Sequence, residues 1–159
     1  MRVVLQRASR ASVSVEGEVV GEIGRGLLLL VGVGSGDPDE HVSRLADKIA
    51  TLRVFADEEG KTNLALADVA GGALVISQFT LYGDVRKGRR PSWSPAEDPD
   101  RAATMVEAFA AALEARGVPV ARGIFGADME VELVNDGPFT LILDADRLSA
   151  MAHEGGPLA

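Results

Sequence analysis

The sequence contains no cysteine and only two histidines, His41 and His153. A chain without cysteine has no disulfide framework, no thiolate nucleophile and no cysteine-ligated zinc or iron–sulfur site. Two histidines are also too few for a multi-histidine metal cage. We therefore expect no metal site in this protein.

Long apolar segments and excess positive charge are missing as well. The aliphatic run at residues 27–31 is far shorter than the ~20 residues of a membrane-spanning helix. The first residues do not resemble a signal peptide, so we expect a cytoplasmic protein without membrane contact. The net charge is −8, whereas a protein that binds nucleic acid over its whole surface is basic. Any contact with RNA must therefore come from a local basic patch.

What is present suits one globular domain. The chain has 159 residues, 47% of them hydrophobic, and this length needs no disulfide or metal to support a core. Glycine and proline gather near the end of the chain at residues 155–157, a composition typical of a surface segment. We expect a single domain over residues 1–144 and a C-terminal surface tail over residues 145–159.

The order of predicted elements favours an α+β fold. One helix is expected to begin with Asp37 as cap and Pro38 at its first position, and a second with Asp98 as cap and Pro99 next. A polar loop over residues 83–98 precedes the second helix, and Gly117 ends it. Strands are predicted at residues 2–8, 11–15, 19–23, 27–31, 73–79, 118–121, 129–134 and 139–143.

Two polar segments could carry chemistry. Ser77, Gln78 and Thr80 follow a buried strand at the point where it ends, which is a usual position for site residues. The second segment is Asn-Asp-Gly-Pro at residues 135–138, between two predicted strands. By itself, this second segment predicts only a turn.

Together the two segments resemble the signature pair of the D-aminoacyl-tRNA deacylase family. The resemblance rests on Ser-Gln-Phe-Thr-Leu at residues 77–81 and Asn-Asp-Gly-Pro-Phe-Thr at residues 135–140. Phe139 and Trp93 depart from the pattern, because the family usually has valine and phenylalanine there. Further similar segments are residues 6–8, 11–15, 57–63, 87–93 and 125–129.

The resemblance implies a fold, an assembly and a reaction. The fold would be twisted, barrel-like sheets with helices outside, in a homodimer with its active sites at the subunit interface. Ser77, Gln78, Phe79 and Thr80 of one subunit would face Gly137 and Pro138 of the other. The implied reaction is hydrolysis of the ester that joins a D-amino acid, or glycine, to the 3′ end of a tRNA. No metal or organic cofactor is implied.

The sequence limits how such an ester can be cleaved. A hydroxyl nucleophile normally needs a neighbouring base such as histidine. His41 is predicted on the surface in the first turn of a helix, and His153 lies in the tail, so neither pairs with Thr80. One remaining mechanism is assisted by the 2′-hydroxyl of the substrate, with backbone N–H donors near Phe79 and Thr80 stabilising the oxyanion. The other uses Thr80 as the nucleophile.

A basic cluster offers the local RNA contact. Arg86, Lys87, Arg89 and Arg90 stand within five positions, and Arg7 would extend the patch. We expect these side chains to contact tRNA phosphates and not DNA, although a solvated loop has the same composition. Two alternatives to the deacylase remain open. One is an esterase for another small acyl ester, and the other is a non-catalytic RNA-binding module.

The Gly137–Pro138 pair suggests how L-amino acids would be rejected. Glycine lets the backbone approach the α-carbon of a substrate closely, and X–Pro bonds adopt the cis form at low cost. We predict a cis bond here, with both carbonyls directed into the pocket of the partner subunit. Such a wall excludes L side chains and still admits glycine.

Overall fold

The computed structural model describes residues 1–148. Two α-helices, eight strands and three short 3-10 helices (η1–η3) make up this part of the chain. In chain order the elements are β1 (Arg2–Val15), β2 (Glu18–Ile23), β3 (Gly26–Gly32), α1 (Glu40–Thr51), β4 (Phe55–Ala56), β5 (Thr62–Leu64), η1 (Ala67–Val69), β6 (Gly72–Ser77), η2 (Phe79–Tyr82), α2 (Pro99–Glu114), β7 (Val120–Arg122), β8 (Glu130–Asp144) and η3 (Ala145–Arg147).

Six of the strands form one strongly curved sheet in the order β2-β1-β3-β6-β7, with β8 also paired to β1. The pairs β3–β6 and β6–β7 are parallel, and the others in this sheet are antiparallel. The curvature brings β2 close to β7. A Cβ built on Gly21 would lie 2.6 Å from the carbonyl oxygen of Arg122, so only glycine permits this approach. The result is the expected α+β fold with a nearly closed, barrel-like sheet.

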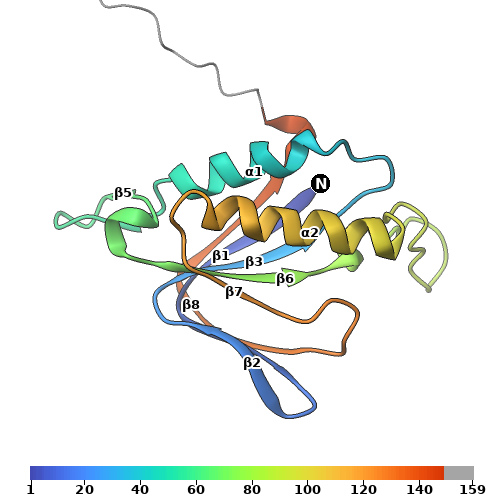
Figure 1. The fold of residues 1–159 in the computed structure, drawn as a ribbon, viewed down its shortest axis with the longest axis horizontal. Helices are drawn as coiled ribbons and strands as arrows, with labels where there is room; N and C mark the ends of the chain where they lie inside the picture. The colour runs from blue at the N-terminus through green and yellow to red at the C-terminus, as the bar shows by residue number, and fades with distance from the viewer. Residues whose placement is uncertain (149–159) are drawn as a thin grey trace, which may run out of the picture.

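Both α-helices cover the same side of the sheet (Figure 1). The strand β3 is buried on both of its faces, as its aliphatic run predicts. Leu27 and Leu29 pack toward the helices, in a cluster that includes Leu45 of α1 and Phe109 of α2. Leu28 points to the other side and packs inside the barrel.

The start of α2 agrees with the sequence, whereas the start of α1 does not. Asp98 caps α2 by accepting a hydrogen bond from the backbone N–H of Asp100, and Pro99 is the first helical residue. The prediction that Asp37 caps α1 is wrong, because that helix begins at Glu40 with Asp39 at the cap position. Asp37 is buried and accepts a hydrogen bond from the N–H of Gly34 at 2.6 Å.

The prediction that His41 lies on the surface is also wrong. Its side chain is 3% exposed, and its Nδ1 lies 3.2 Å from Asp37 Oδ1 and 3.3 Å from the α-amino nitrogen of Met1. The amino group of Met1 also forms an ion pair with Asp37. These three polar groups satisfy one another, which is how buried charge is normally accommodated. The strand β1 brings Met1 to His41 from forty residues away in the chain. Local sequence patterns around His41 therefore could not indicate that its side chain is buried.

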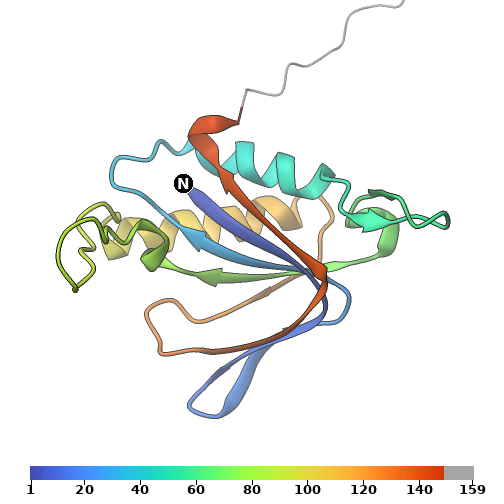
Figure 2. The ribbon, with the colours of Figure 1, turned by 180° about the vertical axis from the view of Figure 1, so that it is seen from behind.

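The two strands predicted at 129–134 and 139–143 are a single strand, β8, which runs beside β1 (Figure 2). The residues that predict a turn form a bulge instead. Ala8 pairs with Asn135 and Gln6 pairs with Thr140, so Arg7 alone faces residues 136–139. Because β1 is fourteen residues long, it continues past the bulge and holds both halves of β8 in one sheet.

Packing continues past residue 144. Ala145 is fully buried, and its N–H donates to the carbonyl oxygen of Met1. Leu148 packs against the main core. The remainder of the segment assigned to a surface tail, residues 149–159, lies outside the described residues. No helix within residues 1–148 combines the length and apolar character needed to cross a membrane.

Candidate active site

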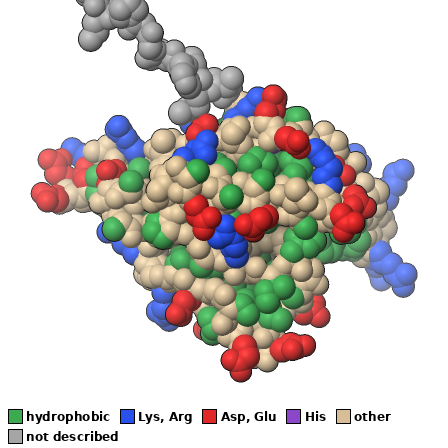
Figure 3. Space-filling model, viewed as in Figure 1, with side chains coloured by type: hydrophobic (Ala, Val, Ile, Leu, Met, Phe, Trp, Pro, Cys, Tyr) green, Lys and Arg blue, Asp and Glu red, His purple; other side chains and the backbone are tan. Residues whose placement is uncertain are grey.

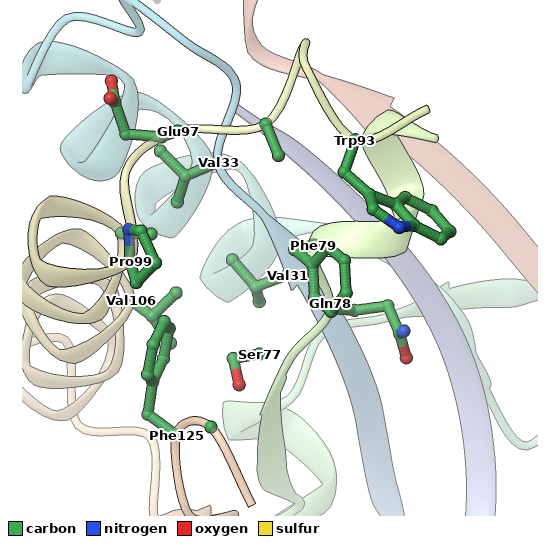
Figure 4. Close-up of a pocket in the computed structure, with 13 residues that line it drawn as sticks. Val31, Val33, Ser77, Gln78, Phe79, Trp93, Glu97, Pro99, Val106 and Phe125 are labelled. Carbon is green, nitrogen blue, oxygen red and sulfur yellow. The ribbon is translucent and has the colours of Figure 1, made fainter. Parts of the chain in front are cut away.

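A cavity of about 410 Å³ opens where β3 and β6 end, between these strands and the start of α2. Val31 and Val33 line it from β3 and the loop that follows, and Ser77 lines it from the end of β6. Val106 and Phe125 stand on the far side, across the hollow from Phe79 (Figure 4). The lining is mostly apolar with a few polar groups, Ser77, Gln78 and Glu97, which is typical of a small-molecule site.

The first predicted motif lies at this cavity. Ser77 ends β6, and Gln78 anchors the turn that follows because its N–H donates to the carbonyl oxygen of Val31 at 2.7 Å. The chain then enters η2, which carries Phe79 and Thr80. Ser77, Gln78 and Phe79 line the cavity, and Thr80 follows directly.

The hydroxyl of Thr80 has a defined partner. The side-chain amide of Gln78 donates a hydrogen bond to Thr80 Oγ1. An amide N–H is a donor and cannot take a proton from a hydroxyl. Within residues 1–148, no carboxylate, histidine or lysine forms a hydrogen bond with this hydroxyl. The surroundings of Thr80 therefore orient its side chain without activating it.

The backbone of η2 presents free donors. Phe79 and Thr80 begin this 3-10 helix, so their N–H groups have no acceptor inside it. In the described part of the chain, these two N–H groups also donate to no side chain or loop carbonyl. Two adjacent backbone donors at the mouth of an apolar cavity can stabilise a developing oxyanion.

The far end of η2 is fixed by residues that the sequence did not single out. The Arg2 guanidinium lies 5.0 Å from the centre of the Tyr82 ring and donates to the carbonyl oxygen of Leu81 at 2.9 Å. Arg2 also forms an ion pair with Asp144. Burial raises the pKa of Tyr82, and the nearby carboxylate of Asp37 raises it further. Only the folded chain brings these distant residues to η2.

The second predicted motif does not line this cavity. Gly137 and Pro138 lie in the exposed bulge of β8, and the bond between them is cis, as predicted. Arg7 holds the bulge: its Nε donates to the carbonyl oxygen of Asp136 at 3.1 Å, and its guanidinium lies 4.8 Å from the centre of the Phe139 ring. In the described chain, Gly137 and Pro138 are therefore exposed on a bulge that Arg7 holds in place.

The predicted RNA-binding residues occupy three different situations. The Arg7 side chain is only 14% exposed and is engaged with the bulge. Arg86 pairs with Asp84 through two hydrogen bonds of 2.9 and 2.7 Å, which hold the pKa of this carboxyl near 2. Lys87, Arg89 and Arg90 are exposed at the tip of the loop. Figure 3 shows basic side chains projecting from the side of the molecule where this loop lies.

No three histidine, aspartate or glutamate side chains of residues 1–148 are grouped as the ligands of one metal ion would be.

Known proteins resemble this chain over nearly its whole length. The model of the family described as D-Tyr-tRNA(Tyr) deacylase matches residues 4–144. A D-aminoacyl-tRNA deacylase of Chloroflexus aurantiacus is 62% identical over 155 residues, which cover 98% of this chain and 97% of the relative. A protein of the same name from Thermus aquaticus is 56% identical, with 91% and 95% of the two chains covered.

Two solved structures have the same architecture. The structure described as a c-Myc DNA unwinding element binding protein has a TM-score of 0.84 and 37% identity, covering 91% of this chain and 98% of that one. A probable eukaryotic D-amino acid tRNA deacylase has a TM-score of 0.79, with 89% and 97% covered. At 20% identity, this second likeness concerns the fold alone.

Proposed function

Because this chain belongs to the D-Tyr-tRNA(Tyr) deacylase family, we propose that it hydrolyses the ester between a D-amino acid and the 3′ end of a tRNA. The observation that carries the proposal is the family match over residues 4–144, which spans both the cavity and the Gly-Pro bulge. The high identity to relatives named D-aminoacyl-tRNA deacylase supports the same substrate class. The products are a free D-amino acid and a tRNA with a free 3′-hydroxyl.

The surroundings of Thr80 favour catalysis assisted by the substrate. In the proposed reaction, the 2′-hydroxyl of the terminal ribose orders a water molecule that attacks the ester carbonyl. The N–H groups of Phe79 and Thr80 receive the negative charge that develops on the carbonyl oxygen. The C–O bond to the ribose then breaks, and the ribose 3′-oxygen takes up the proton that the attacking water loses. Thr80 orients the substrate in this scheme and forms no covalent intermediate.

Selection against L-amino acids requires a second copy of the chain. We assign this role to Gly137 and Pro138 of the partner subunit in a homodimer, which would reach the cavity near Phe79. Their exposure and the firm attachment of the bulge by Arg7 support this role. A rigid backbone wall against the α-carbon excludes an L side chain by steric clash. Glycine has no side chain, so glycyl-tRNA is a substrate as well.

The loop tip is the proposed contact with the tRNA backbone. Lys87, Arg89 and Arg90 would neutralise phosphates without reading sequence. Arg86 is engaged with Asp84 and so shapes the loop more than it binds RNA. The need for a 2′-hydroxyl makes RNA the substrate and excludes a role for DNA ends in the reaction.

The test is release of amino acid from charged tRNA by the purified protein. D-tyrosyl-tRNA, glycyl-tRNA and L-tyrosyl-tRNA are compared with a simple acyl ester of tyrosine. We expect rapid release from the first two and little from the others. Comparable hydrolysis of L- and D-tyrosyl-tRNA would refute the chiral selection. Preference for the simple ester would identify a general esterase, and tRNA binding without release would identify a binding module.

A further inference from the structure

Two large aromatic side chains stand exposed at the mouth of the cavity. Phe79 is 55% exposed and Trp93, the single tryptophan of the chain, is 43% exposed. Their ring centres are 5.1 Å apart and the ring planes meet at 75°, an edge-to-face arrangement (Figure 4). Phe79 belongs to the segment with the free N–H donors. An exposed aromatic surface beside these donors is typical of a ligand-binding site.

The tryptophan is held in place. Its ring lies against Gly83, where an added Cβ would be 2.8 Å from Trp93 Cζ3. Its carbonyl oxygen accepts a hydrogen bond of 2.9 Å from the N–H of Ala96. Just before it, Asp84 and Ser92 exchange two backbone hydrogen bonds of 2.8 and 2.9 Å that close the neck of the basic loop. The ring is therefore a fixed platform next to η2.

The surroundings of this platform are chemically complementary to a single strand of nucleic acid. On one side lie the cations of the loop tip, Lys87, Arg89 and Arg90, for which no ion pair is found within residues 1–148. On the other side lies the mostly apolar cavity with the backbone donors. Trp93 lines the mouth of this cavity and follows the basic loop in the chain, so a single strand that contacts both the loop tip and the cavity would run past the platform. Unpaired bases stack on exposed aromatic rings, and flanking cations hold their phosphates.

We propose that Trp93, supported by Phe79, stacks the base that precedes the aminoacylated terminal nucleotide of the tRNA. This inference rests on the proposed function and adds a recognition site to it. Stacking at this base would orient the last phosphodiester, and so direct the terminal ribose and its ester toward the N–H groups of Phe79 and Thr80.

The single tryptophan makes the site directly observable. The probe is an uncharged RNA hairpin with a single-stranded 3′ end, compared with hairpins that carry an abasic nucleotide at the last or the penultimate position. We expect the intact hairpin to quench the emission of Trp93, because a stacked base is in contact with the indole. The penultimate abasic hairpin should quench far less and bind about tenfold more weakly. An abasic last nucleotide should leave the quenching in place.

Two substitutions separate stacking from a structural effect. Trp93→Phe keeps an aromatic ring and should retain most of the preference for the intact hairpin over the penultimate abasic one, measured by competition with labelled RNA. Trp93→Ala should bind both hairpins equally and weakly. Unchanged emission at saturating RNA would overturn the proposal, as would equal affinity of the wild-type protein for the two hairpins.

A protein contact at the platform would show differently. If the emission shifts with protein concentration in the absence of RNA and saturating RNA changes it no further, another chain covers the indole and the proposal fails. Deacylation is measured independently with charged tRNA. If RNA does not quench the emission but deacylation is intact, only the stacking proposal is refuted. If RNA quenches the emission but no amino acid is released, only the proposed reaction is refuted.

Discussion

The hydroxyl of Thr80 accepts a hydrogen bond from the amide of Gln78, which is no base. This contact favours catalysis assisted by the substrate over a mechanism in which Thr80 is the nucleophile. We expect Thr80→Ala to retain substantial deacylation, because a hydroxyl without a base contributes position and not nucleophilicity. Loss of an essential nucleophile would instead reduce kcat by orders of magnitude, on the order of 10⁶-fold in a serine hydrolase. The measurement is single-turnover release from D-tyrosyl-tRNA, with and without EDTA, which should have no effect.

The matched substrate control is a tRNA that ends in 2′-deoxyadenosine and carries the amino acid on its 3′-oxygen. It should be hydrolysed poorly, because it lacks the hydroxyl that orders the water. A Thr80→Ala protein that is folded and binds tRNA but releases no amino acid would restore the nucleophile to this residue.

Tyr82 is the only tyrosine, so its ionisation can be followed in the whole protein. Burial raises its pKa in the folded state, whereas a tyrosine in the unfolded chain ionises at a pH of about 10. Its contribution to stability is therefore complete below the unfolded pKa and declines as the pH rises above it, because the unfolded chain releases this proton first. Tyrosinate absorbance should appear only together with loss of helical circular dichroism.

Tyr82→Phe identifies the source of the absorbance signal. Tyrosinate that forms near pH ~10 while the circular dichroism is unchanged would show that the ring is accessible in the folded state.

The basic residues of the loop between η2 and α2 differ in their surroundings. Arg86 is paired with Asp84 at the neck, whereas Lys87, Arg89 and Arg90 stand at the tip. Replacing all three tip residues with glutamine should weaken tRNA binding and reduce the slope of log K against log salt by about 2–3, because each phosphate contact contributes roughly 0.7–0.9. Binding is measured by filter retention over a range of salt concentrations.

Arg86→Gln is the matched control within the same loop. It removes a charge that Asp84 already neutralises, so the salt slope should stay close to that of the wild type. Equal slopes for the wild-type and triple-variant proteins would leave the loop as a solvated surface.

The strand β8 carries both the Gly-Pro bulge and an uncovered edge. It pairs with β1 on one side, and within residues 1–148 no strand pairs with its other side. Near the end of β8, Leu141 is 36% exposed and Ile142 is 72% exposed. Neighbouring residues of a strand point to opposite faces, so both faces are open here. Proteins normally cover such an edge, and a second copy of the chain would do so.

For the whole molecule we therefore expect Ile142→Glu to convert a dimer into a monomer. Deacylation of D-tyrosyl-tRNA should be lost with it, because the cavity then lacks the Gly137–Pro138 wall of a partner. Sedimentation equilibrium measures the mass, and circular dichroism checks that the fold is intact. Val19→Glu, at an exposed apolar position of β2, serves as the control and should remain dimeric and active. A monomeric wild-type protein with full activity would contradict the proposal that Gly137 and Pro138 of a partner subunit complete the cavity.

The sequence by itself determined the class of fold and most elements, and it marked Ser77–Thr80 as a candidate segment that the structure places at the cavity. A continuous aliphatic run located the doubly buried β3, and capping chemistry located the start of α2, because both signals are local. The segment Ser77–Thr80 stood out locally because it follows a buried strand at its end, and its interpretation as a motif came from the resemblance to the deacylase family. The cis bond at Gly137–Pro138 was predicted from the resemblance together with the special chemistry of proline.

Only the tertiary structure decided how distant segments use their residues. The turn chemistry of residues 135–138 became a bulge, because the long strand β1 continues beside it. Asp37 was predicted to cap a helix and His41 to lie on the surface. Both lie instead in a buried cluster, because β1 brings Met1 to them. Arg7 was expected in the RNA-contact patch and Arg2 was not singled out, yet Arg2 holds η2 and Arg7 holds the bulge. These contacts join residues far apart in the chain, and local patterns contain no information about which partners the fold will bring together.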